Sequence, residues 1–125
     1  MTLQESFTTC IKKYADFSGR APRSEYWWFI LAQFLLGFVA GFVLGFIGGI
    51  MGMGTSLADI GSVVLMLGLF LPALGVAIRR LHDTGKSGWW YLLVFIPIIG
   101  WLVLLYWFVQ PSTEGTNEYG EAPVL

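Results

Sequence analysis

The longest run without a charged residue constrains the fold of this chain more than any other feature. It extends over Tyr26–Ala58, between Glu25 and Asp59. A helix rises 1.5 Å per residue and needs about 20 apolar residues to cross a bilayer. The run is therefore long enough for one membrane-spanning helix and a connection, but too short for two spans. We place this first span at residues 26–49.

Two further apolar runs follow, and they predict a second span at residues 60–78 and a third at 89–109. Backbone polar groups in lipid are satisfied only in helices or closed barrels, and these runs lack the alternation of barrel strands. Charged residues make up 12% of the chain, against about 25% in soluble domains. The sequence therefore predicts an all-α integral membrane protein with three transmembrane helices in a single domain, residues 1–125.

The segment before the first span predicts a short amphipathic helix. Residues 1–25 divide into a helical part, 1–15, and a turn rich in Gly and Pro, 17–25. A helix with this pattern, directly before a span, is typical of one that lies in the membrane interface. Residues 110–125 form a polar tail. The apolar side of the interfacial helix carries Leu3, Phe7, Cys10, Ile11 and Tyr14.

The distribution of lysine and arginine predicts how the spans are oriented. Their number alternates along the non-spanning segments: Lys12, Lys13, Arg20 and Arg23 first, none in the first loop, Arg79, Arg80 and Lys86 in the second, and none in the tail. The positive-inside rule then places the N-terminus in the cytoplasm and the C-terminus outside. An alternative stays open, because Pro97 and Gly100 interrupt the third run. Its halves could fold as a re-entrant hairpin and return the tail to the cytoplasm.

Glycines recur at regular spacing in the first two spans. Glycine costs about 1 kcal/mol against alanine within a helix, so a row of glycines indicates close approach of another backbone. The row predicts helix packing, either with another span or with another copy of the chain. In the first span the period is four, and in the second it is seven: Gly37, Gly41, Gly45 and Gly49, then Gly61, Gly68 and Gly75.

Two polar clusters flank the spans, and both are predicted on the cytoplasmic side. Arginine binds carboxylates and lipid phosphates through paired hydrogen bonds. These residues could therefore bind lipid headgroups or partner proteins, or an acid of one cluster could pair with an arginine of the other. The candidate residues are Arg20, Arg23 and Glu25 before the first span, and Arg79, Arg80, His82, Asp83 and Lys86 before the third.

Several function classes lack the residues that they require. One histidine and one cysteine do not supply the three or four ligands of a protein zinc site, so no metal or cofactor is predicted. No basic surface indicates nucleic-acid binding. His82 and Asp83 are adjacent, but no nucleophile or second carboxylate completes a catalytic set. The sequence therefore predicts that the chain is not an enzyme.

The two polar clusters resemble signatures of a known family. FSGRAPRSEYWW at residues 17–28 and RRLHDTGKSGWW at residues 79–90 are similar to motifs of the domain-of-unknown-function 805 family of small bacterial inner-membrane proteins. IPIIGW at residues 96–101 and GTNEYG at residues 115–120 resemble two further motifs of that family. Glu118 departs from the pattern, in which this position is usually arginine. The resemblance implies the bacterial cytoplasmic membrane, and it implies no reaction, substrate or cofactor.

These observations lead to one leading hypothesis and two alternatives. The leading hypothesis is a non-enzymatic inner-membrane protein that associates with lipid headgroups, with itself or with other membrane proteins. The first alternative is a small oligomeric transporter or channel, with Gln33 and the break at Pro97 lining a path. The weakest is an enzyme that uses His82 and Asp83 on a lipid-derived substrate.

Overall fold

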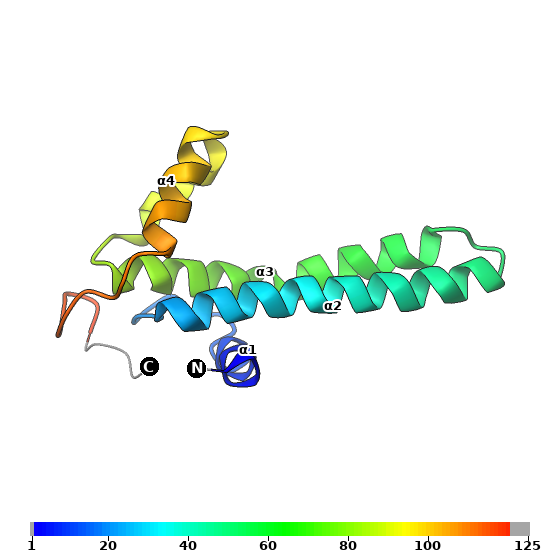
Figure 1. Cartoon of the computed structure of the whole chain (residues 1–125), viewed down its shortest axis with the longest axis horizontal. Helices are drawn as coiled ribbons and strands as arrows, with labels where there is room; N and C mark the ends of the chain where they lie inside the picture. Colours follow the sequence, from blue (N-terminus) through cyan, green and yellow to red (C-terminus); the bar gives the residue numbers. More distant parts are fainter. Residues whose placement is uncertain (1, 121–125) are drawn as a thin grey trace.

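The described residues, 2–120, form only helices and connecting segments in a computed structural model (Figure 1). This confirms the all-α prediction for that part of the chain. Two long helices run side by side, a short helix lies across one end of the pair, and a helical hairpin projects from the same end (Figure 1). In chain order the helices are α1 (Leu3–Lys12), α2 (Arg23–Ile50), α3 (Ser56–Asp83), the 3-10 helix η1 (Gly88–Phe95) and α4 (Ile99–Phe108).

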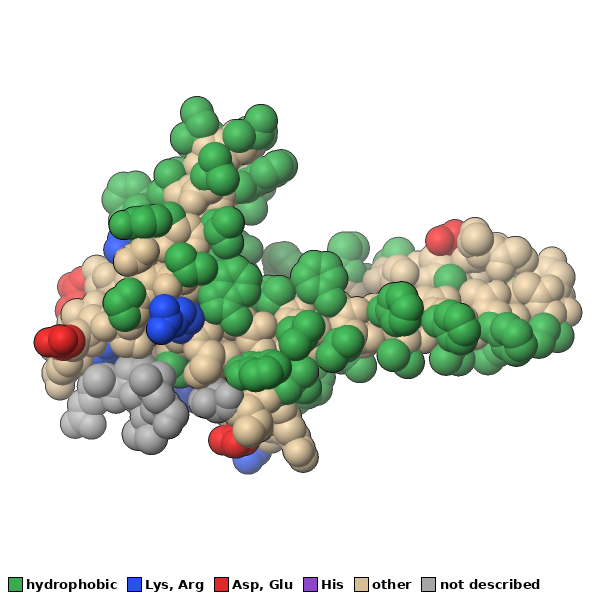
Figure 2. Space-filling view, viewed as in Figure 1, with side chains coloured by type: hydrophobic (Ala, Val, Ile, Leu, Met, Phe, Trp, Pro, Cys, Tyr) green, Lys and Arg blue, Asp and Glu red, His purple; other side chains and the backbone are tan. Residues whose placement is uncertain are grey.

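Helices α2 and α3 have the length and surface of membrane-spanning helices. Each has 28 residues, or about 42 Å, against about 30 Å of hydrocarbon in a bilayer. Both are apolar enough to cross a membrane, and they contain the predicted spans 26–49 and 60–78. Phe34, Phe38 and Phe42 are 73%, 75% and 69% exposed. Figure 2 shows such hydrophobic side chains along the length of α2, as expected for a helix surrounded by lipid.

Helix α1 packs on the long pair through part of its predicted apolar side. Cys10 is fully buried, and the Phe7 ring stacks on Phe29 of α2 with the ring centroids 5.9 Å apart. Beyond the helix, the Tyr14 hydroxyl donates a hydrogen bond to the carbonyl of Gly68 in α3 (2.7 Å). These contacts fix α1 beside the end of α2 and α3 that contains Arg23 and Asp83. We call this end the base of the pair.

Residues 88–108 do not form the continuous third span that the sequence predicts at 89–109. Helices η1 and α4 are separated by a reversal, in which Ile99 N–H donates to the Pro97 carbonyl (2.8 Å) across Ile98. Ile98 has φ 67° and ψ −69°, a strained conformation for a β-branched residue. The Trp101 indole N–H then donates to the Val94 carbonyl (2.8 Å), and α4 runs back along η1 (Figure 1).

The reversal makes each arm of the hairpin too short to cross a bilayer. Ten α-helical residues and eight 3-10 residues extend over about 15 Å each, half of the hydrocarbon thickness. Only two of the three predicted spans therefore have a spanning helix in residues 2–120. The reversal also brings residues 110–120 back to the base, beside α1. This differs from the expectation that the tail lies across the membrane from the N-terminal segment.

Gly100 is the residue that permits the two arms to meet. A Cβ atom added there would lie 1.9 Å from the Leu93 carbonyl oxygen and 3.0 Å from the Ile96 Cβ. We expect Gly100→Ala to lower the free energy of unfolding by about 1–3 kcal/mol, because backbone atoms would have to move. Thermal unfolding in detergent, followed by circular dichroism, measures this change. The control is Gly68→Ala, whose added Cβ meets nothing within 4 Å, and equal stability of the two variants would contradict the hairpin geometry.

The two predicted glycine rows differ in how they pack within the described residues. An added Cβ would meet nothing within 4 Å at any position of the first row or at Gly68 of the second. The other two glycines of the second row lie at close contacts: an added Cβ would lie 2.3 Å from Leu44 of α2 at Gly61, and 3.2 Å from the Asp16 carbonyl oxygen at Gly75. The row in α2 thus faces outward from the described chain, and its role in helix packing stays a prediction.

Candidate functional site

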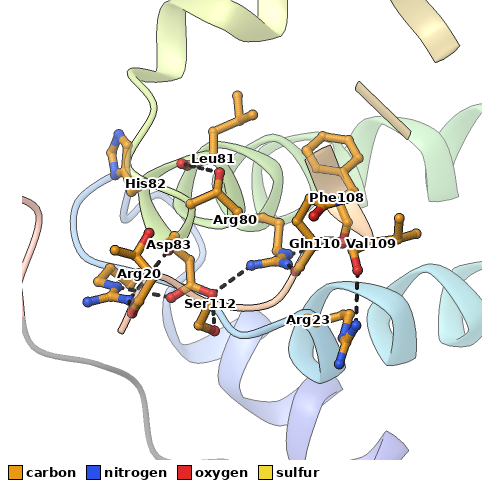
Figure 3. A network of polar contacts seen from close by, with 12 residues as sticks. Arg20, Arg23, Arg80, Leu81, His82, Asp83, Phe108, Val109, Gln110 and Ser112 are labelled. Atoms are coloured by element: carbon orange, nitrogen blue, oxygen red, sulfur yellow. Dashed lines mark hydrogen bonds and ion pairs between the residues drawn. The ribbon is translucent and has the colours of Figure 1, made fainter. Parts of the chain in front are cut away.

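Five charged side chains are buried together at the base of the α2–α3 pair. We call Arg20, Glu25, Arg79, Arg80 and Asp83 the basal network. Each is less than one tenth exposed. Charged side chains are almost never buried to this degree unless they are paired. The network brings together the turn before α2, the first turn of α2 and the last turn of α3, and Figure 3 shows the part around Asp83, beside Ser112 of the tail.

Asp83, the last residue of α3, is the centre of the larger half of the network. Its carboxylate accepts hydrogen bonds from Arg20 Nε (2.9 Å) and Arg80 Nη1 (2.6 Å), and its side chain has no exposed surface. The Ser112 hydroxyl of the tail donates a third bond to the same carboxylate. The backbone carbonyl of Asp83 accepts from Thr113 N–H (2.9 Å). One carboxylate therefore connects three segments that are distant in the sequence.

Glu25 and Arg79 form the smaller half, which connects α2 to α3. Glu25 Oε1 accepts a hydrogen bond from Arg79 Nη1 (2.8 Å), and both side chains are fully buried. Cys10 Sγ of α1 lies 3.7 Å from the same oxygen, and the Ser6 hydroxyl donates to the Glu25 backbone carbonyl. Arg79 Nε and Nη2 are buried without a hydrogen-bond partner among residues 2–120. Glu25 Oε1 is thus the only hydrogen-bond acceptor of the Arg79 guanidinium within these residues.

The surroundings of Cys10 keep its thiol protonated. Burial, and next the negative charge of Glu25, raise the pKa of the Cys10 thiol to about 12. The thiolate is the nucleophilic form of cysteine. At neutral pH Cys10 therefore acts as a packing residue and a weak hydrogen-bond donor, and not as a reactive group.

Arg20 binds the backbone of the tail. Its Nη atoms donate to the carbonyls of Thr113 (2.6 Å), Gly115 (2.7 Å) and Gly120 (3.2 Å). The basal network contains three arginines and two carboxylates, which leaves one excess positive charge in a buried place. Carbonyl oxygens turned toward the guanidinium offset that charge. The tail is thus part of the electrostatic balance of the network.

The C-terminal end of α4 is held by three side chains from α2 and α3. Helix ends leave carbonyl groups without intrahelical partners, and these groups carry partial negative charge. Trp27 Nε1 (3.1 Å) and Arg80 Nε (3.1 Å) donate to the Phe108 carbonyl, and Arg23 Nη1 donates to that of Val109 (3.0 Å; Figure 3). Arg80 also donates to the Gln110 carbonyl. The α4 helix is therefore anchored where it meets the base.

His82 and Asp83 are neighbours in sequence, but their side chains diverge (Figure 3). His82 Nδ1 bonds to the Gly19 carbonyl (3.0 Å), and its ring stacks on Tyr119 with the centroids 4.0 Å apart. The Asp83 carboxylate faces Arg20 and Arg80 instead. The two groups thus cannot act on one substrate atom in this arrangement. Within residues 2–120 no three His, Cys, Asp or Glu side chains gather as a metal site would require.

The structure unites most of the predicted candidates and separates two of them. Glu25 and Asp83 each pair with an arginine of the opposite cluster, which is the cross-pairing that the sequence left as one alternative. Arg23 lies outside the buried set and is exposed. Lys86 Nζ lies 5.0 Å from the centre of the Trp107 ring, away from Asp83. The predicted lipid or partner contacts of these residues stay predictions.

Several residues of the site were not predicted from the sequence. None of these residues is charged, and most of them act through a hydroxyl, an amide or a backbone group. A search of the sequence for charged clusters therefore does not find them. The GTNEYG motif at residues 115–120 was the available signal, since it contains Asn117, whose amide donates to the His82 carbonyl (2.9 Å). The residues concerned are Ser6, Cys10, Trp27, Ser112, Thr113, Asn117 and Tyr119.

Comparison with known proteins gives matches over nearly the whole chain. A family model described as "Protein of unknown function (DUF805)" matches residues 14–121. Inner membrane protein YhaI of Escherichia coli strain K12 is 44% identical over 117 residues, which cover 94% of this chain and 93% of the relative. Inner membrane protein YhaH of the same strain is 40% identical, with 92% and 93% covered. The uncharacterized protein YiiR is 33% identical, with 78% and 60% covered. No solved structure matches.

Proposed function

Because this chain belongs to the DUF805 family of proteins of unknown function, we propose that it is a non-enzymatic inner-membrane protein that acts by associating with other membrane helices. One observation carries this proposal. The glycine row of α2 (Gly37, Gly41, Gly45 and Gly49) has nothing within 4 Å of an added Cβ atom at any of its four positions. Small residues let helix backbones approach closely in membranes, and within residues 2–120 no atom occupies this surface.

The partner is a second copy of the chain or another membrane protein. Gln33 lies one helical turn before Gly37 and continues the row, and an amide in lipid gains from a hydrogen bond across a helix interface. The burial of the basal network also favours association through α2. Arg20, Arg79 and Arg80 are buried against protein acceptors, so they are not free to bind a partner. Association through α2 is therefore favoured over association through these arginines.

In the proposed arrangement α2 and α3 cross the inner membrane and both chain ends are cytoplasmic. All seven lysines and arginines lie near the base: four before or at the start of α2, and three in the last turn of α3 or just after it. The positive-inside rule assigns this base to the cytoplasm. Lys12 and Lys13 are exposed at the end of α1 and would contact lipid headgroups. The hairpin of η1 and α4 projects from the base across the direction of α2 and α3 (Figure 1), so it would lie along the membrane surface without crossing the bilayer.

Bulky substitutions on the glycine row test the proposal. We expect Gly41→Ile with Gly45→Ile to abolish association, because the added side chains hold the partner backbone away. Folding of the single chain should be unaffected, since both positions are open. Crosslinking in native membranes and native mass spectrometry measure association.

The matched control is Val39→Ile with Val43→Ile, which adds bulk on another exposed face of α2. The control variant should associate as the wild type does. If the glycine variant associates equally well, or if the wild type has no partner by either method, the proposal fails.

A second function, a small oligomeric transporter, is favoured by one observation. A cavity of about 270 Å³ between α2 and α3 is lined by Gln33 and Ser62, the polar side chains within the spans. Pro97 lies in the projecting hairpin, so the two features would not line one path within a single chain. Flux of solutes into liposomes that contain the protein would support this function, and association without flux would support the first.

A further inference from the structure

A second cavity, of about 430 Å³, lies in the corner between the end of α3 and the start of η1. Its size is that of a small-molecule site. Its walls are mainly apolar and include Leu74, Ile78 and Leu92. The polar groups at its inner end come from His82 and Ser87. None of the contacts described for the basal network uses this space.

His82 directs a nitrogen with a lone pair toward the cavity. The Gly19 carbonyl can only accept a hydrogen bond, so His82 Nδ1 carries the proton in the neutral ring. Nε2 is then the acceptor, and it has no hydrogen-bond partner among residues 2–120. A Cβ atom added at Gly88, in the cavity wall, would lie 3.7 Å from Nε2. His82 is 8% exposed and lines the cavity, so the surface it retains is available to a molecule bound there.

Ser87 supplies the complementary group. Its oxygen accepts a hydrogen bond from Trp89 N–H (3.3 Å), and its hydroxyl proton is a donor. No acidic side chain lines the cavity, and the Asp83 carboxylate is turned away toward Arg20 and Arg80. The inner end thus offers one basic acceptor and one donor, with no negative charge, and apolar walls extend from it.

From this geometry we propose that the cavity binds the carboxyl end of a fatty acid. One carboxyl oxygen shares a proton with His82 Nε2, and the other accepts a bond from the Ser87 hydroxyl. The alkyl chain lies along Leu74, Ile78 and Leu92 and continues toward the lipid. A carboxyl group suits the site better than an alcohol, because it can reach the acceptor and the donor with separate oxygens, whereas an alcohol has one oxygen for both.

The single histidine of the chain makes a direct test possible. The full chain, labelled with ¹⁵N-histidine in phosphatidylcholine nanodiscs, is titrated with decanoic acid and, separately, with decanol. The free protein should give the spectrum of the tautomer protonated at Nδ1. Decanoic acid should shift the Nε2 resonance in a saturable manner, decanol should not, and Ser87→Ala should weaken decanoic-acid binding about tenfold.

A cavity-filling variant controls for partition of the acid into the bilayer. Leu74→Trp should abolish the shift, and Leu67→Trp, at an exposed position of the same helix, should keep it. The Nδ1-protonated spectrum of each unliganded variant shows that it is folded. If Leu74→Trp does not fold, Ser87→Ala decides. An equal shift with decanol, no shift with either molecule, or undiminished binding by folded Leu74→Trp or by Ser87→Ala would each overturn the proposal.

Discussion

Replacing Asp83 with alanine is expected to destabilise the protein by about 3–5 kcal/mol, because it removes one partner from a fully buried ion pair. Arg20 and Arg80 would both lose their carboxylate, with no exposed surface through which water could replace it. The tail would also lose its bond from Ser112 to that carboxylate. Residues 112–120 should therefore become accessible to protease even where the helices persist.

Two measurements on the protein in detergent detect these effects. Unfolding monitored by circular dichroism gives the loss of stability, and limited proteolysis gives the release of the tail. Asp59→Ala is the matched control, since Asp59 is exposed at the far end of α3 and bonds only to Thr55 among the described side chains. Its effect should be within about 0.5 kcal/mol. Equal stability of the Asp83 and Asp59 variants would show that the network does not hold the base together.

Replacing Glu25 with leucine should have an effect of similar size, about 3–5 kcal/mol, at the other half of the network. Arg79 would keep its charge and lose the acceptor for Nη1, and its other guanidinium nitrogens, Nε and Nη2, already lack partners within residues 2–120. The buried Cys10 thiol would lose the same acceptor. Helix α1 reaches this carboxylate through Cys10. When the ion pair is lost, α1 should therefore detach from α2 and α3.

A double-mutant cycle separates the ion pair from the loss of a side chain. Arg79→Met combined with Glu25→Leu removes both charges and keeps similar volumes, and it should recover most of the lost stability. The single Arg79→Met variant should be destabilised, because Glu25 is then buried and unpaired. Unfolding free energies of the four proteins give the coupling. Additive effects would contradict a paired Glu25 and Arg79.

The parts of the fold that depend on composition and charge were predictable from the sequence. The uncharged runs give α2 and α3, because few other structures bury so much apolar surface and satisfy the backbone in lipid. The charges of the two polar clusters are visible in the sequence, which allows two alternatives for them: cross-pairing, or contacts with headgroups and partners. The sequence could not decide between them, since Lys and Arg beside a span are expected at headgroups in any case.

The hairpin, the partner of the glycine row and the position of the tail depend on contacts that no local sequence pattern determines. The apolar segment 89–109 has the length of a span, and Pro97 is tolerated in many membrane helices. Only the close approach of Gly100 to the Leu93 carbonyl makes the reversal compact. In the same way, the spacing of Gly37 and Gly41 indicates a packing surface without indicating the partner. The tail was missed because Arg20 and Arg80 bind mainly its backbone carbonyls, which every sequence has.

Central to the proposed arrangement is that the hairpin of η1 and α4 returns residues 110–120 to the base, which would place both ends of the chain on the cytoplasmic side. Reporter fusions test it directly, since green fluorescent protein fluoresces when it is cytoplasmic and alkaline phosphatase is active when it is exported. A C-terminal fusion should be fluorescent and lack phosphatase activity, and a fusion after Gly52, between α2 and α3, should have the opposite pattern. Phosphatase activity at the C-terminus would mean that residues 88–108 cross the membrane, and it would contradict the account.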